Sequence, residues 1–175
     1  MHSRAYAIRL ILANACALAT LAHAGGPHAI TTETSMNQTA NGPFDVKLNT
    51  LDPYNADEGA GLGRMSIDKQ FHGDLDAASK GEMLSTGVPA PKGSGAYVAI
   101  ERVTGSLNGK RGSFVLVHNA TMTAGVPYLN IIVAPGSGTG ELSGLSGQMK
   151  IDIAPGGKHS YTFDYRYDDR RGVAR

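Results

Sequence analysis

The sequence has no tryptophan, a single cysteine and no excess of charge of either sign. One cysteine cannot form a disulfide within the chain, so the fold must be stabilised by its core alone. The 16 basic and 15 acidic residues leave no broad basic face of the kind that binds nucleic acid or anionic lipid. We therefore expect no nucleic-acid partner and no disulfide scaffold.

Residues 1–24 have the parts of an export signal. Arg4 and Arg9 supply positive charge, and LILANACALATLA is an apolar core too short to cross a bilayer. The AHA that ends at Ala24 matches a cleavage site, so we expect a periplasmic or secreted protein cleaved near that residue. Cys16 leaves an alternative open, a lipoprotein whose mature chain starts there. No later stretch is long and apolar enough to predict a membrane span.

The rest of the chain divides by its hydrophobic pattern. Residues 25–42 are polar and without period, which predicts a flexible linker. From Phe44 on, apolar and polar residues alternate, as they do in strands with one buried face. We therefore expect one β domain over residues 43–167 and a charged, solvated tail over residues 168–175.

Eight segments fit short strands, because Gly, Pro, Asn and Asp separate them. The expected strands span residues 44–49, 64–75, 79–84, 97–107, 112–122, 128–134, 148–154 and 159–167. The third has the weakest alternation, and a helical turn is its alternative. The last carries a row of four aromatic residues that we expect to form a core wall. Strands at this spacing predict an antiparallel sandwich or a closed barrel, and a barrel of about eight strands holds side chains or one small ligand.

The pair Asn108-Gly109 is a strong signal for a two-residue hairpin turn. That turn places Glu101 opposite Leu116 and makes His118 its diagonal neighbour, with Cα atoms roughly 7 Å apart. A shift of one residue would put the two side chains on opposite faces. Their shared face also carries aromatic and small residues, so we interpret it as the interior. The other face is mixed and could be a subunit interface, which leaves a homo-oligomer open.

Three long blocks follow one another along the chain: LGRMSIDKQFHGDLDAASKGEML, GAYVAIERVTGSLNGKRGSFVLVHNATM and GSGTGELSGLSGQMKIDIAPGGKHSYTFDY. Together they resemble the bacterial domain-of-unknown-function family 3224 over about residues 43–167. That family is similar in fold to allene oxide cyclases and, more distantly, to plant dirigent proteins. The resemblance implies an all-β, antiparallel eight-stranded barrel with a central cavity, no cofactor and a tendency to form oligomers. It implies no catalytic residues, because no catalytic motif matches residue by residue.

A buried carboxylate must find a partner or take up a proton. Glu101 and His118 are therefore the candidate catalytic pair, and Lys69 or His159 is a further candidate partner of the acid. The expected ligand-binding residues of the cavity are Lys69, Phe71, Met83, Tyr97, Leu116 and Phe163. The scattered histidines have no metal-ligand spacing, and no cofactor motif occurs, so we expect neither a metal nor a cofactor.

Three functions remain open from the sequence. The first is a barrel that binds a small apolar or amphipathic molecule. The second is a cofactor-independent cyclase or isomerase in which Glu101 transfers a proton. The third is a structural protein with a filled barrel, in which Glu101 and His118 only hold the strands in register.

Overall fold

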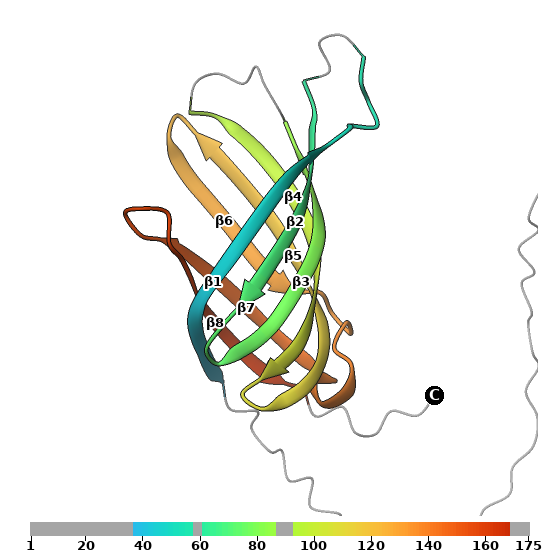
Figure 1. The fold of residues 1–175 in the computed structure, drawn as a ribbon, viewed down its shortest axis with the longest axis vertical. Coiled ribbons are helices and arrows are strands. Elements are labelled where there is room, and N and C mark those ends of the chain that lie inside the picture. The colour runs from blue at the N-terminus through green and yellow to red at the C-terminus, as the bar shows by residue number, and fades with distance from the viewer. Residues whose placement is uncertain (1–36, 58–60, 87–92, 169–175) are drawn as a thin grey trace, which may run out of the picture. The chain divides into compact units, whose positions relative to one another are not determined.

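A computed structural model describes residues 37–57, 61–86 and 93–168. The expected export signal, Cys16, most of the expected linker and most of the expected tail lie outside these residues. The described part contains eight strands and one short 3-10 helix, and the strands close into an all-β antiparallel barrel (Figure 1). The fold class expected from the sequence is therefore confirmed.

Each strand pairs with its neighbour in chain order, and β8 pairs with β1 to close the barrel. The elements are β1 (Gln38–Leu51), β2 (Gly63–Phe71), β3 (Leu75–Ser85), β4 (Gly95–Leu107), β5 (Lys110–Thr123), β6 (Val126–Val133), η1 (Gly140–Leu142), β7 (Leu145–Ile153) and β8 (His159–Tyr167).

The predicted boundary at residue 43 is wrong, because β1 begins at Gln38, inside the segment expected to be a flexible linker. Ala40 is fully buried in this part of the strand, and the Tyr165 hydroxyl donates a hydrogen bond to Gln38 Oε1 at 2.9 Å. Pairing with β8 holds this polar segment in a strand, although its sequence lacks the alternation that predicts one. The segment at 79–84 is also a strand, part of β3, and not a helical turn.

The hairpin between β4 and β5 has the predicted register, with Glu101 opposite Leu116. Asn108 and Gly109 have φ angles of 48° and 82°, the left-handed backbone that a tight two-residue turn requires. The Glu101 face points inward as expected. Ile100 on the opposite face is 61% exposed, and self-association through that outer face stays a prediction.

Large side chains fill one end of the barrel, the end at which β4 turns into β5 (lower in Figure 1). The stacked rings of Phe114 and Phe163 lie 5.7 Å apart there, and Leu142 of η1, in the connection between β6 and β7, is buried in the same core. The aromatic row of β8 forms part of this core wall, as predicted. The interior of the barrel at this end is filled by these buried side chains.

Tyr161 links β8 to the turn between β2 and β3. Its hydroxyl accepts a hydrogen bond from the Leu75 backbone N–H at 2.8 Å and donates one to the His72 carbonyl at 3.0 Å. Gly42 makes this contact sterically feasible, because a side chain there would collide with the same carbonyl group. The tyrosine therefore satisfies backbone groups that the sheet leaves unpaired.

We predict that Tyr161→Phe lowers the free energy of unfolding by about 1–3 kcal/mol, since it leaves the buried Leu75 N–H without an acceptor. Urea unfolding measures this change. The matched control is Tyr54→Phe, at a fully exposed position, which we expect to be neutral. Equal midpoints for Tyr161→Phe and the unmodified protein would contradict this role of the hydroxyl.

Candidate functional site

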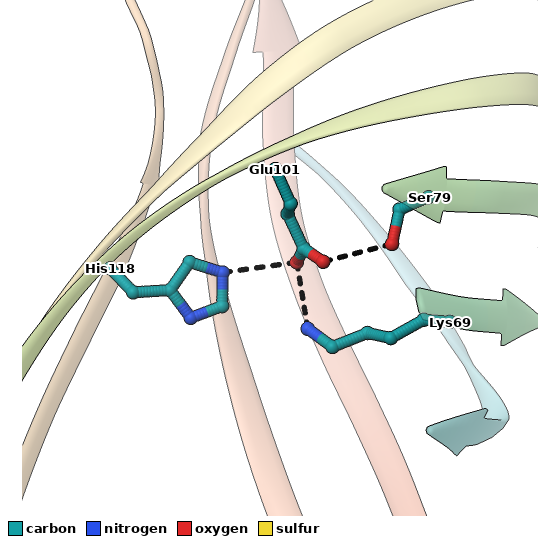
Figure 2. Close-up of polar contacts among 4 residues, drawn as sticks. All are labelled: Lys69, Ser79, Glu101 and His118. Carbon is teal, nitrogen blue, oxygen red and sulfur yellow. Dashed lines mark hydrogen bonds and ion pairs between the residues drawn. The ribbon is translucent and has the colours of Figure 1, made fainter. Parts of the chain in front are cut away.

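The carboxylate of Glu101 lies in the barrel interior and is bound by side chains from three other strands (Figure 2). Lys69 Nζ of β2 and His118 Nε2 of β5 contact Oε1 at 2.7 Å and 3.0 Å. Ser79 Oγ of β3 donates a hydrogen bond to Oε2 at 2.8 Å. We call these four residues the Glu101 cluster. An ionised carboxylate only accepts hydrogen bonds, so the Nε2 atom of His118 carries a proton.

Strand register brings the Glu101 cluster together. Lys69 faces Ser79 across β2 and β3, while Gly81 faces Glu101 across β3 and β4. A side-chain carbon at Gly81 would come within 2.6 Å of the Glu101 Cβ, so glycine at this position makes room for the acid. Because all these residues alternate inward, the inner face of four neighbouring strands, β2 to β5, supplies the acid and its partners.

The charges of the Glu101 cluster compensate one another. Burial alone would raise the pKa of Glu101, but the hydrogen bond from His118 and the positive charge of Lys69 outweigh it and lower that pKa to about 2. The ammonium group of Lys69 also lies 5.3 Å from the Phe44 ring centre and 5.6 Å from that of Phe71, so it gains cation–π contacts. Glu101 is therefore ionised across the neutral range.

The sequence identified three of these four residues. Lys69 is the partner of Glu101, as one of the two alternatives proposed, whereas His159 lies against the Phe44 ring at 5.1 Å between centres. Ser79 was missed, because the expected strand over residues 64–75 ran through His72-Gly73-Asp74, where the chain turns from β2 into β3. The catalytic role of Glu101 and His118 stays a prediction.

The opposite end of the barrel holds a cavity of about 380 Å³. We call this cavity, between the ends of β3, β4, β5 and β6, the mouth. Its lining residues are Met83, Ser85, Thr86, Gly95, Ala96, Tyr97, Ala120, Thr121, Met122, Pro127, Tyr128 and Leu129. Met83 and Tyr97 lie there as expected.

The other expected lining residues do not reach the mouth. Phe71, Leu116 and Phe163 are fully buried in the packed core, and Lys69 is held in the Glu101 cluster. Strand alternation showed that these side chains point inward but not how far along the barrel they lie. The same alternation at the ends of β5 and β6 could have identified Met122 and Leu129.

The Glu101 cluster lies one layer deeper than the mouth. Along β4, the inward-facing residues are Tyr97, then Ala99, then Glu101, and Ala99 faces His118 across β5. Burial and, after it, the negative charge of Glu101 raise the pKa of Tyr97. The mouth is therefore an apolar recess, and the buried ion pairs of the Glu101 cluster lie beneath it.

Within the described residues, no group of three or more His, Cys, Asp or Glu side chains is placed to hold a metal ion. None of the helices in this part of the chain has the length and apolar character needed to cross a bilayer.

These features define a closed antiparallel barrel that is packed at one end, charged in the middle and open at the other end. The family model described as "Protein of unknown function (DUF3224)" matches residues 40–165, and the chain belongs to this family. The chain is 47% identical to a protein of unknown function from the same family in Shewanella oneidensis MR-1, known from a crystal structure. That match covers 76% of this chain and 99% of the other, with a TM-score of 0.70. No curated protein matches the chain.

We predict that Glu101→Leu lowers the free energy of unfolding by about 3–5 kcal/mol, because it leaves the ammonium group of Lys69 buried without a counter-charge. Adding Lys69→Met and His118→Leu should recover most of this loss, since packed apolar groups replace a buried ionic network well. Glu82→Leu is the control, because its ion pair with Arg64 is partly exposed and should contribute under about 1 kcal/mol. Urea unfolding compares all variants. A triple variant no more stable than Glu101→Leu would contradict this account.

The low pKa of Glu101 also predicts a dependence of stability on pH. A carboxyl group with an ordinary pKa of 4.5 in the unfolded chain and about 2 in the fold stabilises the fold fully above pH 4.5. That contribution, up to about 3 kcal/mol, is lost as the pH falls towards 2. The gap in unfolding free energy between the unmodified protein and Glu101→Gln should therefore narrow over this window. A gap that is the same at pH 5 and pH 2.5 would show that Glu101 titrates normally in the fold.

Proposed function

We propose that this barrel binds one small apolar or amphipathic molecule in its mouth. The proposal rests on one observation: side chains fill the barrel interior at one end and leave a cavity at the other end. Phe114 and Phe163 close one end of the barrel, whereas the small side chains of Ala99 and Ala120 leave space beside the mouth at the other. Concave, mostly apolar recesses with a few polar groups are typical ligand sites.

Exposed apolar side chains at the mouth support this proposal. Met122 and Leu129 occupy inward-facing positions of β5 and β6, yet they are 43% and 37% exposed. An apolar ligand seated there would cover surface that now contacts water, which is a favourable change.

The wall beside the mouth is also incomplete. Between β6 and β7, only Ile131 with Met149 and Ile132 with Gln148 are in register, whereas the other neighbouring strands pair along most of their length. The first part of β6 therefore has no partner in β7. An apolar molecule could reach the mouth from this side as well as from the end of the barrel.

The Glu101 cluster favours binding over proton transfer. Both carboxylate oxygens of Glu101 are engaged, its pKa is lowered to about 2, and it has no exposed surface. A general base needs a pKa near the working pH and reach to its substrate. We therefore assign Glu101 the role of holding the strands beneath the ligand, and we leave catalysis as the less favoured alternative. On residues 1–24 alone, we propose that the protein acts after export.

Phenylnaphthylamine, a neutral apolar dye that fluoresces on leaving water, tests the proposal. We predict that the unmodified protein binds this dye and that Ala120→Phe loses most of the binding while it remains folded, because the new ring fills the mouth. Asn119→Phe is the matched control, since the neighbouring residue faces outward and is exposed. Dye titration measures affinity, and circular dichroism checks the fold.

Mass spectrometry of the purified, denatured protein complements the titration by identifying any organic molecule that copurifies, against a mock purification. Equal dye affinity in Ala120→Phe and the unmodified protein would place binding outside the mouth. Absence of both dye binding and a copurified compound would contradict the proposed function.

A further inference from the structure

Two residues that carry hydroxyl groups are neighbours in the lining of the apolar mouth. Tyr97 of β4 faces Ser85 of β3 in the register of the barrel, so their Cβ atoms are roughly 5 Å apart. Both side chains point inward, both are half-buried, and both line the cavity. Met83 and Met122 supply apolar surface to the same cavity.

Neither of these hydroxyl groups forms a hydrogen bond with another residue in the described part of the chain. The neighbouring Thr86 differs, since its hydroxyl accepts a hydrogen bond from the Ala96 backbone N–H at 3.1 Å. Polar groups in a half-buried apolar recess are normally paired, because loss of water without a replacement partner is unfavourable. With respect to the described residues, the hydroxyl groups of Tyr97 and Ser85 are therefore available to donate to a bound molecule.

The surroundings disfavour an anionic ligand. Among the described residues, the cavity lining contains no lysine, arginine or histidine, and the ammonium group of Lys69 is held by Glu101 one layer below. The negative charge of Glu101 is felt at Tyr97, where burial and this charge raise the pKa of the phenol. Tyr97 thus keeps its proton and acts as a donor, while an anion would lose its hydration without gaining a counter-charge.

We infer that the ligand of the mouth is an uncharged, largely apolar molecule with an accepting oxygen, such as a ketone, ester or ether. The hydroxyl groups of Tyr97 and Ser85 are the hydrogen-bond donors that the cavity offers to such an oxygen, and the methionines contact the apolar part of the molecule. This inference rests on the proposed function and adds the chemical class of the ligand.

Three dyes test the inference on the whole protein. Prodan is a neutral naphthalene ketone whose emission moves to longer wavelength when its carbonyl accepts a hydrogen bond. Phenylnaphthylamine has no carbonyl group, and anilinonaphthalene sulfonate is the same ring system with an added negative charge. Each is titrated into the unmodified protein, Tyr97→Phe, Ser85→Ala and the control Tyr54→Phe, whose hydroxyl is fully exposed.

The expected result is selective for the ketone. Tyr97→Phe should weaken prodan binding roughly 2- to 12-fold, the value of one hydrogen bond, and shift the emission of bound prodan to shorter wavelength. Ser85→Ala should act in the same direction, which keeps the test informative if Tyr97→Phe folds poorly. Phenylnaphthylamine should bind these variants and Tyr54→Phe as it binds the unmodified protein, and the sulfonate should bind more weakly than phenylnaphthylamine throughout.

Two results would overturn the inference while leaving the proposed function intact. The first is that Tyr97→Phe and Ser85→Ala change the affinities for prodan and for phenylnaphthylamine by the same factor. The hydroxyl groups would then have no role as hydrogen-bond donors to the ligand. The second is that the sulfonate binds as tightly as phenylnaphthylamine, which would exclude the preference for uncharged molecules. Failure of all three dyes to bind the unmodified protein, together with the absence of a copurified compound, would instead contradict the proposed function itself.

Discussion

The rest of the barrel interior depends on the buried carboxylate of Glu101. An ionised acid without access to water is tolerated only if other groups replace its hydration, and here Lys69, His118 and Ser79 do so from three strands. The requirement extends to Gly81, where a side chain would collide with the acid. The contacts of one carboxylate therefore constrain which residues stand at neighbouring inward positions of β2, β3, β4 and β5.

This ionic layer divides the barrel into two ends with different properties. Below it, aromatic and aliphatic side chains pack as in any protein core, and the row on β8 is fully used in that packing. Above it, the side chains around the mouth leave a cavity, and the ladder between β6 and β7 is short. Met83 and Met122 can adapt to ligands of different shape, because methionine side chains are unbranched and polarizable. The mouth is thus a recess on a rigid floor, an arrangement that suits binding.

Strand register is predictable from the sequence where a local turn motif specifies it. Asn108-Gly109 sets the hairpin register, and from it follow the shared inward face and the direct contact of Glu101 with His118. Where such a signal is missing, the prediction fails. The start of β1 at Gln38 depends on pairing with β8, which is distant in sequence.

The position of a side chain along the barrel axis is the other property that alternation does not show. Phe71 and Phe163 were therefore expected in the cavity and instead lie in the packed core, while Ser85 was not foreseen in the mouth. The alternation of a strand tells which residues point inward, and the closed barrel decides which of them share a layer.

The most direct measurement is a crystal structure of the protein soaked with a brominated naphthalene, with data collected at the bromine absorption edge. The anomalous signal of bromine locates the probe without any assumption about the natural ligand. We predict a peak in the mouth, between Met83, Tyr97 and Met122. A peak found only on the outer face beside Ile100, or no peak although the probe is present in the crystal, would contradict a ligand-binding mouth.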